Sequence, residues 1–231
     1  METLQLAFGT VCALVWCVNC LSVANCGVGK PLYLTPYIES GKIKDGRKAA
    51  EVPPLLDNIT SYSGFLTVNK KFGSNIFFWF FPAEETPGTA PLAVWLQGGP
   101  GSSSMYAVFK ENGPFCLDGE ANLNRRSAYW SQKLNMIFID QPVGTGFSFT
   151  RSQKGYANNE DDVSLNVYNA LLQFFKLFPE YSNTEFYLTG ESYAGKYIPS
   201  VGYWIHQMNS NASQKINMQG IAIGDGWVDP Y

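Results

Sequence analysis

The apolar residues of the chain form two kinds of pattern: short continuous runs, which predict strands, and repeats three or four residues apart, which predict helices. Short apolar runs with the length and composition of buried strands occur at 92–96, 134–139, 186–188 and 220–223. Two further strand-like runs, 62–68 and 75–81, are joined by the turn-prone residues NKKFGS and predict a hairpin at one edge of a sheet. The aromatic residues 77–81 inside that hairpin are interpreted as core on both faces of the sheet.

A helical pattern follows the predicted strand at 134–139. Apolar residues recur three or four positions apart between Asn159 and Pro179, at Val163, Val167, Leu171, Phe174 and Phe178. A second helix is expected after residue 192, through about 208. Residues 30–57 are rich in Pro and Gly with little periodicity, and are interpreted as an extended covering segment. A hairpin followed by alternating strands and helices predicts an α/β fold, with a mixed sheet covered by helices, in one domain.

The first 24 residues differ from the rest of the chain. Residues 4–24 are apolar and almost uncharged, and Ser22, Val23 and Ala24 offer a small-x-small cleavage site. This pattern predicts a secretory signal peptide over 1–24, although Glu2 precedes it and no Lys or Arg does. An uncleaved anchor is the alternative. No apolar stretch after residue 25 has the length of a membrane span, so none is expected in the mature chain.

Composition limits the partners. The chain has 231 residues, of which 45% are hydrophobic and 15% charged, as in ordinary globular proteins. A net charge of −3 without any basic run argues against a nucleic-acid partner. Cleavage of the signal would leave Cys26 and Cys116, which can pair with each other or with cysteines outside this chain. Two sequons, at Asn58 and Asn211, predict N-glycosylation and fit a secretory route.

The candidate chemistry lies in the segment Glu185–Pro199, EFYLTGESYAGKYIP. A short strand leads into Gly190, a single Ser192, and the small residues that follow it, and then into a helix. This order is typical of a nucleophile elbow, in which a strained turn lifts a serine above the edge of a sheet. Small neighbours let the backbone close, and the N–H of Tyr193 would point to where an oxyanion forms.

Four further segments match the same family. The elbow GESYAGKYIP resembles that of the serine carboxypeptidases, and the remaining segments occur in the family's order: WLQGGPGSSS, ENGPF, FIDQPVGTGFSF and IAIGDGWVDP. The resemblance covers residues 31–231, and the opening PLYLTPYI together with Gln97 is similar to the vitellogenic-like carboxypeptidases. It implies an α/β-hydrolase fold and a secreted or lysosomal serine peptidase without cofactor or metal. Its substrates would be peptides with a free C-terminus.

The resemblance also implies roles for individual residues. Ser192 would be the nucleophile, with the N–H groups of Gly99 and Tyr193 as the oxyanion donors. The residues implied to bind the substrate carboxylate are Gln97, Gly98, Glu111 and Glu191. Because like charges so close raise a carboxyl pKa, the two glutamates are expected to be partly protonated.

The chain departs from the family at two positions. Gln97 stands where the family commonly has Asn, and its extra methylene moves the amide by about 1.5 Å of chain reach relative to the substrate carboxylate. Ser102 replaces a family cysteine, so one familiar disulfide is expected to be absent.

A base for the serine is not evident. His206 lies 14 residues after Ser192, on a helix that leads away from the active face, and is interpreted as a surface or packing residue. Asp225 and Asp229 are interpreted as structural. In this architecture the acid and the base follow the serine in sequence. The chain is therefore expected to be an N-terminal portion, incomplete at its C-terminal side and inactive alone. A non-catalytic scaffold and a carboxypeptidase-like acyltransferase are the alternatives.

Overall fold

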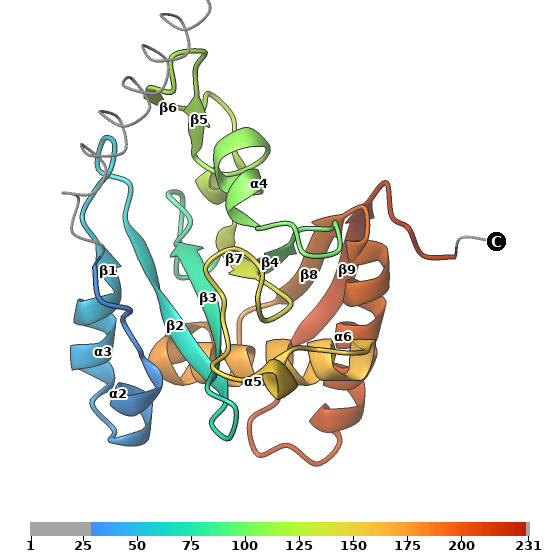
Figure 1. The fold of residues 1–231 in the computed structure, drawn as a ribbon. Helices are drawn as coiled ribbons and strands as arrows, with labels where there is room; N and C mark the ends of the chain where they lie inside the picture. The colour runs from blue at the N-terminus through green and yellow to red at the C-terminus, as the bar shows by residue number, and fades with distance from the viewer. Residues whose placement is uncertain (1–28, 230–231) are drawn as a thin grey trace, which may run out of the picture. The chain divides into compact units, whose positions relative to one another are not determined.

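The computed structural model describes residues 29–229 (Figure 1). Contacts divide the chain into residues 1–31 and residues 32–231, and the description below concerns the second unit. The predicted signal peptide and Cys26 lie outside the described residues. Cys116 is half-buried and forms no disulfide with any residue between 29 and 229. No helix between residues 29 and 229 is both long and apolar enough to cross a membrane.

The centre of the fold is a mixed sheet of seven strands in the order β1-β2-β3-β7-β4-β8-β9 (Figure 1). The strands are β1 (Glu51–Val52), β2 (Ser61–Asn69), β3 (Ser74–Phe81), β4 (Leu92–Leu96), β7 (Asn135–Asp140), β8 (Phe186–Glu191) and β9 (Met218–Gly224). Pairing is antiparallel from β1 to β7 and parallel from β7 to β9. A separate hairpin pairs β5 (Phe115–Leu117) with β6 (Leu123–Arg125). The predicted mixed sheet and edge hairpin are confirmed.

Both faces of the sheet are buried along its central strands, β3, β4 and β7. Along β3, Phe78 and Phe80 belong to one apolar cluster, while Trp79 and Phe81 belong to a second one. Successive residues of a strand point to opposite faces, so the two clusters fill the two sides of the sheet. The prediction of a two-sided aromatic core is confirmed, and it explains why the strands read as unbroken apolar runs.

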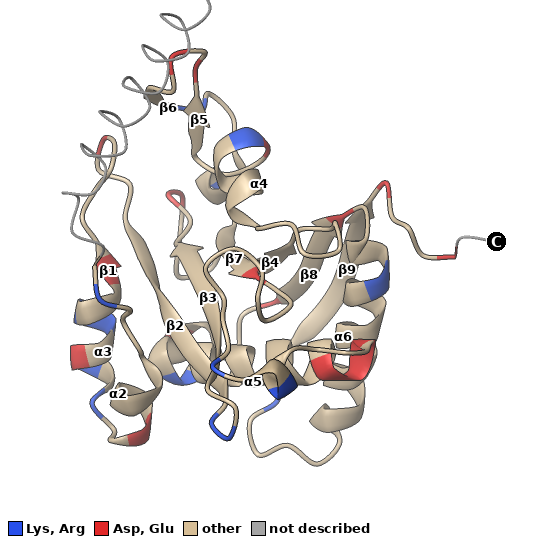
Figure 2. Cartoon of the chain, in the orientation of Figure 1, with Lys and Arg blue, Asp and Glu red and all other residues tan. Residues whose placement is uncertain are grey.

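Helices pack on both faces of the sheet. They are α2 (Thr35–Glu39), α3 (Ile43–Ala50), α4 (Met105–Lys110), α5 (Glu160–Leu177) and α6 (Ala194–Asn209), with short 3-10 turns at Trp130–Gln132, Gln153–Gly155 and Pro179–Tyr181. Buried residues of α5 and α6 contribute to the first cluster and those of α4 to the second. The Asn159 side chain accepts from the N–H of Asp162 at 2.8 Å and caps α5. Three acidic residues in the first turn of α5 suit the positive end of its dipole (Figure 2).

The prediction for residues 30–57 was wrong, because this segment contains two helices and not an extended chain. Pro36 lies in the first turn of α2, where its missing N–H costs nothing. Gly46 lies where α3 meets α2, and a Cβ there would be 2.9 Å from the Cβ of Tyr37. The Pro and Gly that suggested an irregular segment therefore serve a helix start and a helix contact.

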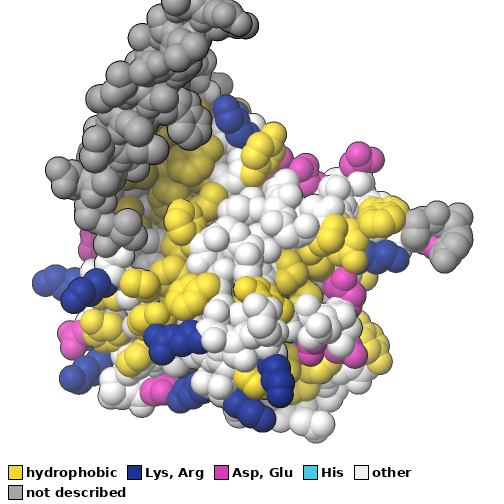
Figure 3. Space-filling model, in the orientation of Figure 1, with side chains coloured by type: hydrophobic (Ala, Val, Ile, Leu, Met, Phe, Trp, Pro, Cys, Tyr) yellow, Lys and Arg dark blue, Asp and Glu magenta, His cyan; other side chains and the backbone are white. Residues whose placement is uncertain are grey.

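Large apolar side chains are also exposed on this unit, and the viewed face shows them in several separate groups (Figure 3). Tyr106, Phe147 and Tyr203 are among the most exposed of them. β9 is an edge strand of the sheet, and Ile221 on it is 49% exposed. Among residues 29–229, no strand pairs with the outer side of β9, so the sheet has a partly apolar edge there.

Candidate active site

The predicted strand–turn–helix is present around Ser192. This residue follows β8, precedes α6 and has a φ of 56°, in the left-handed region that non-glycine residues rarely adopt. Its N–H donates to the Gly224 carbonyl at 2.9 Å, and its carbonyl accepts from the N–H of Trp227 at 2.8 Å. These two bonds to the β9 segment hold the strained turn, and the Ser192 side chain remains exposed.

Two glycines allow the backbone segments to close on one another. A Cβ at Gly98 would lie 2.7 Å from the Tyr193 nitrogen and 2.9 Å from the Ser192 Cβ. A Cβ at Gly190 would lie 2.1 Å from the Leu96 carbonyl oxygen. The glycine-rich loop after β4 therefore packs directly on the elbow, and any side chain at either glycine would force the two segments apart.

Three backbone donors lie free at this contact. The N–H groups of Gly98, Gly99 and Tyr193 have no hydrogen-bond acceptor within residues 29–229. Gly99 has a φ of 112°, which only glycine adopts readily. Free N–H groups beside an exposed serine are what an oxyanion hole requires, because they can bind negative charge that develops on a substrate oxygen.

Asp140 holds the end of the glycine-rich loop by hydrogen bonds, and sequence reasoning missed this role. Its fully buried carboxylate accepts from the Ser103 hydroxyl at 2.6 Å, the Ser104 N–H at 2.9 Å and the Phe147 N–H at 2.8 Å. Burial raises the pKa of Asp140, while these donors act to lower it. A charged residue that ends a buried apolar strand was the available signal, since a buried carboxylate needs dedicated donors.

Next to the elbow, Gln97 binds two glutamates, and these three residues are called the inner cluster. The Gln97 Nε2 donates to Glu191 Oε1 at 2.7 Å and to Glu111 Oε1 at 3.3 Å. Its Oε1 accepts from the Trp95 Nε1 at 2.7 Å. An amide nitrogen has two hydrogens, so both are used inside the inner cluster. The role of Gln97 in binding a substrate carboxylate stays a prediction, and it would require one of these bonds to be exchanged.

The inner cluster holds a glutamate that favours its proton. Burial, then the hydrogen bond and the charge of Glu191, raise the pKa of Glu111 to about 7. The Gln97 amide and the more distant Arg126 guanidinium act in the opposite direction. Glu111 Oε2 is buried and has no hydrogen-bond partner within residues 29–229. A proton on this oxygen would turn an unpaired acceptor into a hydrogen-bond donor.

The remaining predicted residues lie away from Ser192. His206 is exposed in the last turn of α6, roughly 18 Å along the helix axis from its first residue, Ala194, at about 1.5 Å per residue. Asp225 and Asp229 are exposed after β9. Asn58 and Asn211 lie in exposed loops, before β2 and after α6. The structure therefore joins Ser192 to the free N–H groups and the inner cluster, and it keeps His206 out of this group.

Known proteins match the chain over most of its length. The serine carboxypeptidase family matches residues 53–231. The probable serine carboxypeptidase CPVL of Homo sapiens is 56% identical over 203 residues, covering 87% of this chain and 43% of that protein. The vitellogenic carboxypeptidase of Aedes aegypti is 51% identical over 203 residues, with coverages of 87% and 43%.

A solved structure agrees with the sequence relatives. The prohormone-processing carboxypeptidase Kex1(Δ)p of Saccharomyces cerevisiae superposes with a TM-score of 0.73 at 29% identity, over 80% of this chain and 44% of that one. The predicted α/β-hydrolase fold is confirmed by this likeness. The chain spans about two fifths of the length of the curated relatives that it matches.

Proposed function

Because the chain belongs to the serine carboxypeptidase family, we propose that the natural protein removes C-terminal residues from peptides through an acyl-enzyme on Ser192. The observation that carries the proposal is the strained, exposed Ser192 beside three free N–H groups and two glutamates. The exposed sequons and the apolar leader support a secretory location, either secreted or lysosomal.

The reaction proceeds in two steps. The Ser192 hydroxyl attacks the last peptide carbonyl and loses its proton to a base, and the N–H groups of Gly99 and Tyr193 bind the resulting oxyanion. The C–N bond then breaks, and the C-terminal amino acid leaves after its nitrogen takes that proton. Water hydrolyses the ester by the reverse sequence. The base and its acid would come from the part of the family's length that this chain does not span.

The inner cluster would select substrates with a free C-terminus. Glu191 immediately precedes Ser192, so a carboxylate held there places the last peptide bond next to the nucleophile. The Gly98 N–H and a protonated glutamate would donate to that carboxylate, whereas two ionised glutamates would repel it. Substrate binding should therefore weaken as pH rises through about 7, the pKa of Glu111.

Two measurements on the natural protein test this function. A fluorophosphonate probe should label the wild type and not Ser192→Ala, and labelling that persists at another serine would assign the chemistry elsewhere. Free-acid peptides should be cleaved much faster than the same peptides with C-terminal amides. Equal rates for the two at every pH would contradict an exopeptidase.

A further inference from the structure

A cleft of about 410 Å³ lies beside the loop that leads into β2. Its lining includes Asn58, Thr60, Pro82, Glu84, Pro87 and Ser131. Its size is within the range of about 300–1,000 Å³ that is usual for small-molecule sites. The lining combines apolar ring surfaces with a carboxylate and hydroxyls, which is a composition suited to a sugar ring.

The sequon Asn58-Ile59-Thr60 forms one wall of this cleft. Ile59 is 5% exposed and anchors the segment in the core, while Asn58 and Thr60 are exposed. Within residues 29–229, neither the Asn58 side chain nor the Thr60 side chain takes part in a hydrogen bond. The acceptor amide is therefore unconstrained and lies at the rim of a preformed hollow.

We propose that Asn58 carries an N-linked glycan whose first N-acetylglucosamine packs into this cleft. In the transfer, an Asn58 Nδ2–C1 bond forms and the C1–O bond to a lipid diphosphate donor breaks. The lipid diphosphate leaves, and the displaced amide proton goes to the transferase base. The transfer is therefore a substitution at C1 of the sugar, and it needs no oxidant or reductant.

The cleft offers partners to both sides of the sugar. The apolar face of the ring would contact Pro82 and Pro87, while its hydroxyls and N-acetyl group face Glu84 and Ser131. Glu84 already accepts from Tyr129 at 2.6 Å and from Arg125 at 2.7 Å. A carboxylate has about four acceptor positions, so it can also accept from a sugar hydroxyl.

The cleft is remote from Ser192. Phe81, just before the Pro82 wall, pairs with Met136 near the start of β7, whereas Ser192 follows the end of β8. Strands β7 and β8 are both parallel to β4, which lies between them. The start of β7 and the end of β8 are therefore at opposite ends of the strands, and so are the cleft and Ser192. The glycan should therefore change stability and leave turnover unaltered, and this inference is independent of the proposed function.

The first experiment compares glycan forms of the folded natural protein, secreted from eukaryotic cells that keep glycans in the high-mannose state. Endoglycosidase H leaves one N-acetylglucosamine on the asparagine, whereas peptide N-glycosidase F removes the whole glycan. Mass spectrometry of the Asn58 peptide should show the modification. Trimming to one sugar should leave the thermal midpoint unchanged, and complete removal should lower it by about 2–4 °C.

Variants supply the matched controls. Thr60→Ala, which abolishes the sequon, should lower the midpoint as complete removal does, and Thr60→Ser, which keeps it, should not. Ser213→Ala removes the sequon at Asn211 and should leave the midpoint unchanged. Pro87→Ala should destabilise the glycosylated protein more than it destabilises the Thr60→Ala protein, because the coupling reports the sugar–proline contact.

Three results would overturn the proposal. They are an unmodified Asn58, an equal loss of stability after either enzyme, and a Pro87→Ala effect that is the same with and without the sequon. A fall for Ser213→Ala as large as that for Thr60→Ala would assign the effect to glycosylation in general and would equally contradict the cleft.

Discussion

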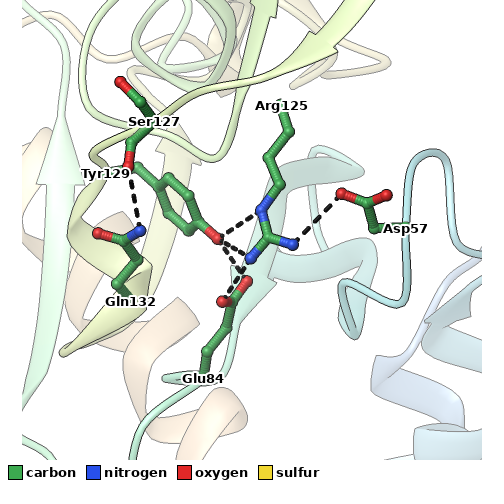
Figure 4. Close-up of polar contacts among 6 residues, drawn as sticks. All are labelled: Asp57, Glu84, Arg125, Ser127, Tyr129 and Gln132. Carbon is green, nitrogen blue, oxygen red and sulfur yellow. Dashed lines mark hydrogen bonds and ion pairs between the residues drawn. The ribbon is translucent and has the colours of Figure 1, made fainter.

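Two groups of acidic residues differ in whether an arginine neutralises them: the first contacts Arg125, and the second lies near Arg126 without contacting it. In the outer cluster, Arg125 Nη2 contacts Glu84 Oε2 at 2.7 Å, Arg125 Nη1 contacts Asp57 Oδ2 at 3.3 Å, and Tyr129 donates to Glu84 (Figure 4). In the inner cluster, Glu111 and Glu191 share an amide, and no cation contacts either glutamate within residues 29–229.

The neighbouring Arg126 explains the difference. Its guanidinium donates hydrogen bonds to the carbonyls of Gly113, Phe109 and Phe115, at 3.1, 3.2 and 3.1 Å. It thereby ties together the α4–β5 corner and acts on Glu111 only through space. Arg125 therefore forms surface ion pairs, whereas its neighbour Arg126 leaves the half-buried pair Glu111 and Glu191 without a contacting cation. An enzyme can use such a pair to hold a proton.

The largest expected effect comes from separating the elbow from the glycine-rich loop. Gly98→Ala would place a methyl group 2.7 Å from the Tyr193 nitrogen, so we expect kcat/KM to fall by about 10²–10³-fold, as for loss of an oxyanion donor. Gly88→Ala is the control, since a Cβ at Gly88 has nothing within 4 Å. Peptidase assays of both variants decide the point, and a fully active Gly98→Ala protein would refute the proposed contact.

Replacing each arginine compares the carbonyl contacts of Arg126 with the ion pairs of Arg125. Arg126→Met leaves three carbonyls without their donor, and we expect a loss of about 1–3 kcal/mol in the free energy of unfolding. Arg125→Met removes surface ion pairs and should cost about 0–1 kcal/mol. Urea unfolding of the natural protein measures both losses. A greater loss for Arg125→Met would reverse the comparison.

The raised pKa of Glu111 predicts a pH dependence of stability. Its pKa is about 7 in the folded state against 4.5 unfolded, so the folded protein binds the extra proton between these values. Stability from this group is complete below about pH 4.5 and is lost as pH rises through 7.

Because Glu111 is partly exposed, screening reduces this loss to the order of 1 kcal/mol. Glu111→Gln should remove that part of the pH profile, measured by urea unfolding from pH 4 to pH 8. Glu84→Gln in the outer cluster should leave the same part in place. An unchanged profile in Glu111→Gln would show that the inner cluster does not hold the proton.

High salt should produce the smallest effect on stability. It should weaken the ion pairs of Arg125 and leave the carbonyl contacts of Arg126 in place. The Arg125 and Glu84 side chains are 39% and 34% exposed, so about 1 M salt should screen their attraction. The stability difference between wild type and Arg125→Met should shrink by a few tenths of a kcal/mol. The difference for Arg126→Met should persist, since its bonds go to neutral carbonyls. Equal salt sensitivity of the two variants would contradict this distinction.

Local patterns in the sequence determined much of the fold. The strands β3, β4 and β7 and the helices α5 and α6 were predicted within one or two residues, because each is a periodic or continuously apolar segment. The elbow was also predicted, since a strained turn between a strand and a helix requires small residues at fixed positions around the serine. Structural elements that depend on about ten consecutive residues were therefore predicted from the sequence alone.

Contacts between distant segments were decided only by the tertiary structure. Residues 30–57 looked irregular, yet packing of α3 on Tyr37 makes Gly46 a helix residue. Three roles depend on which groups meet across the fold. Asp140 binds the glycine-rich loop, the Gln97 amide uses both of its hydrogens, and Arg125 binds carboxylates while Arg126 binds carbonyls. Burial and hydrogen-bond partners set these roles, and neither follows from the neighbours of a residue in sequence.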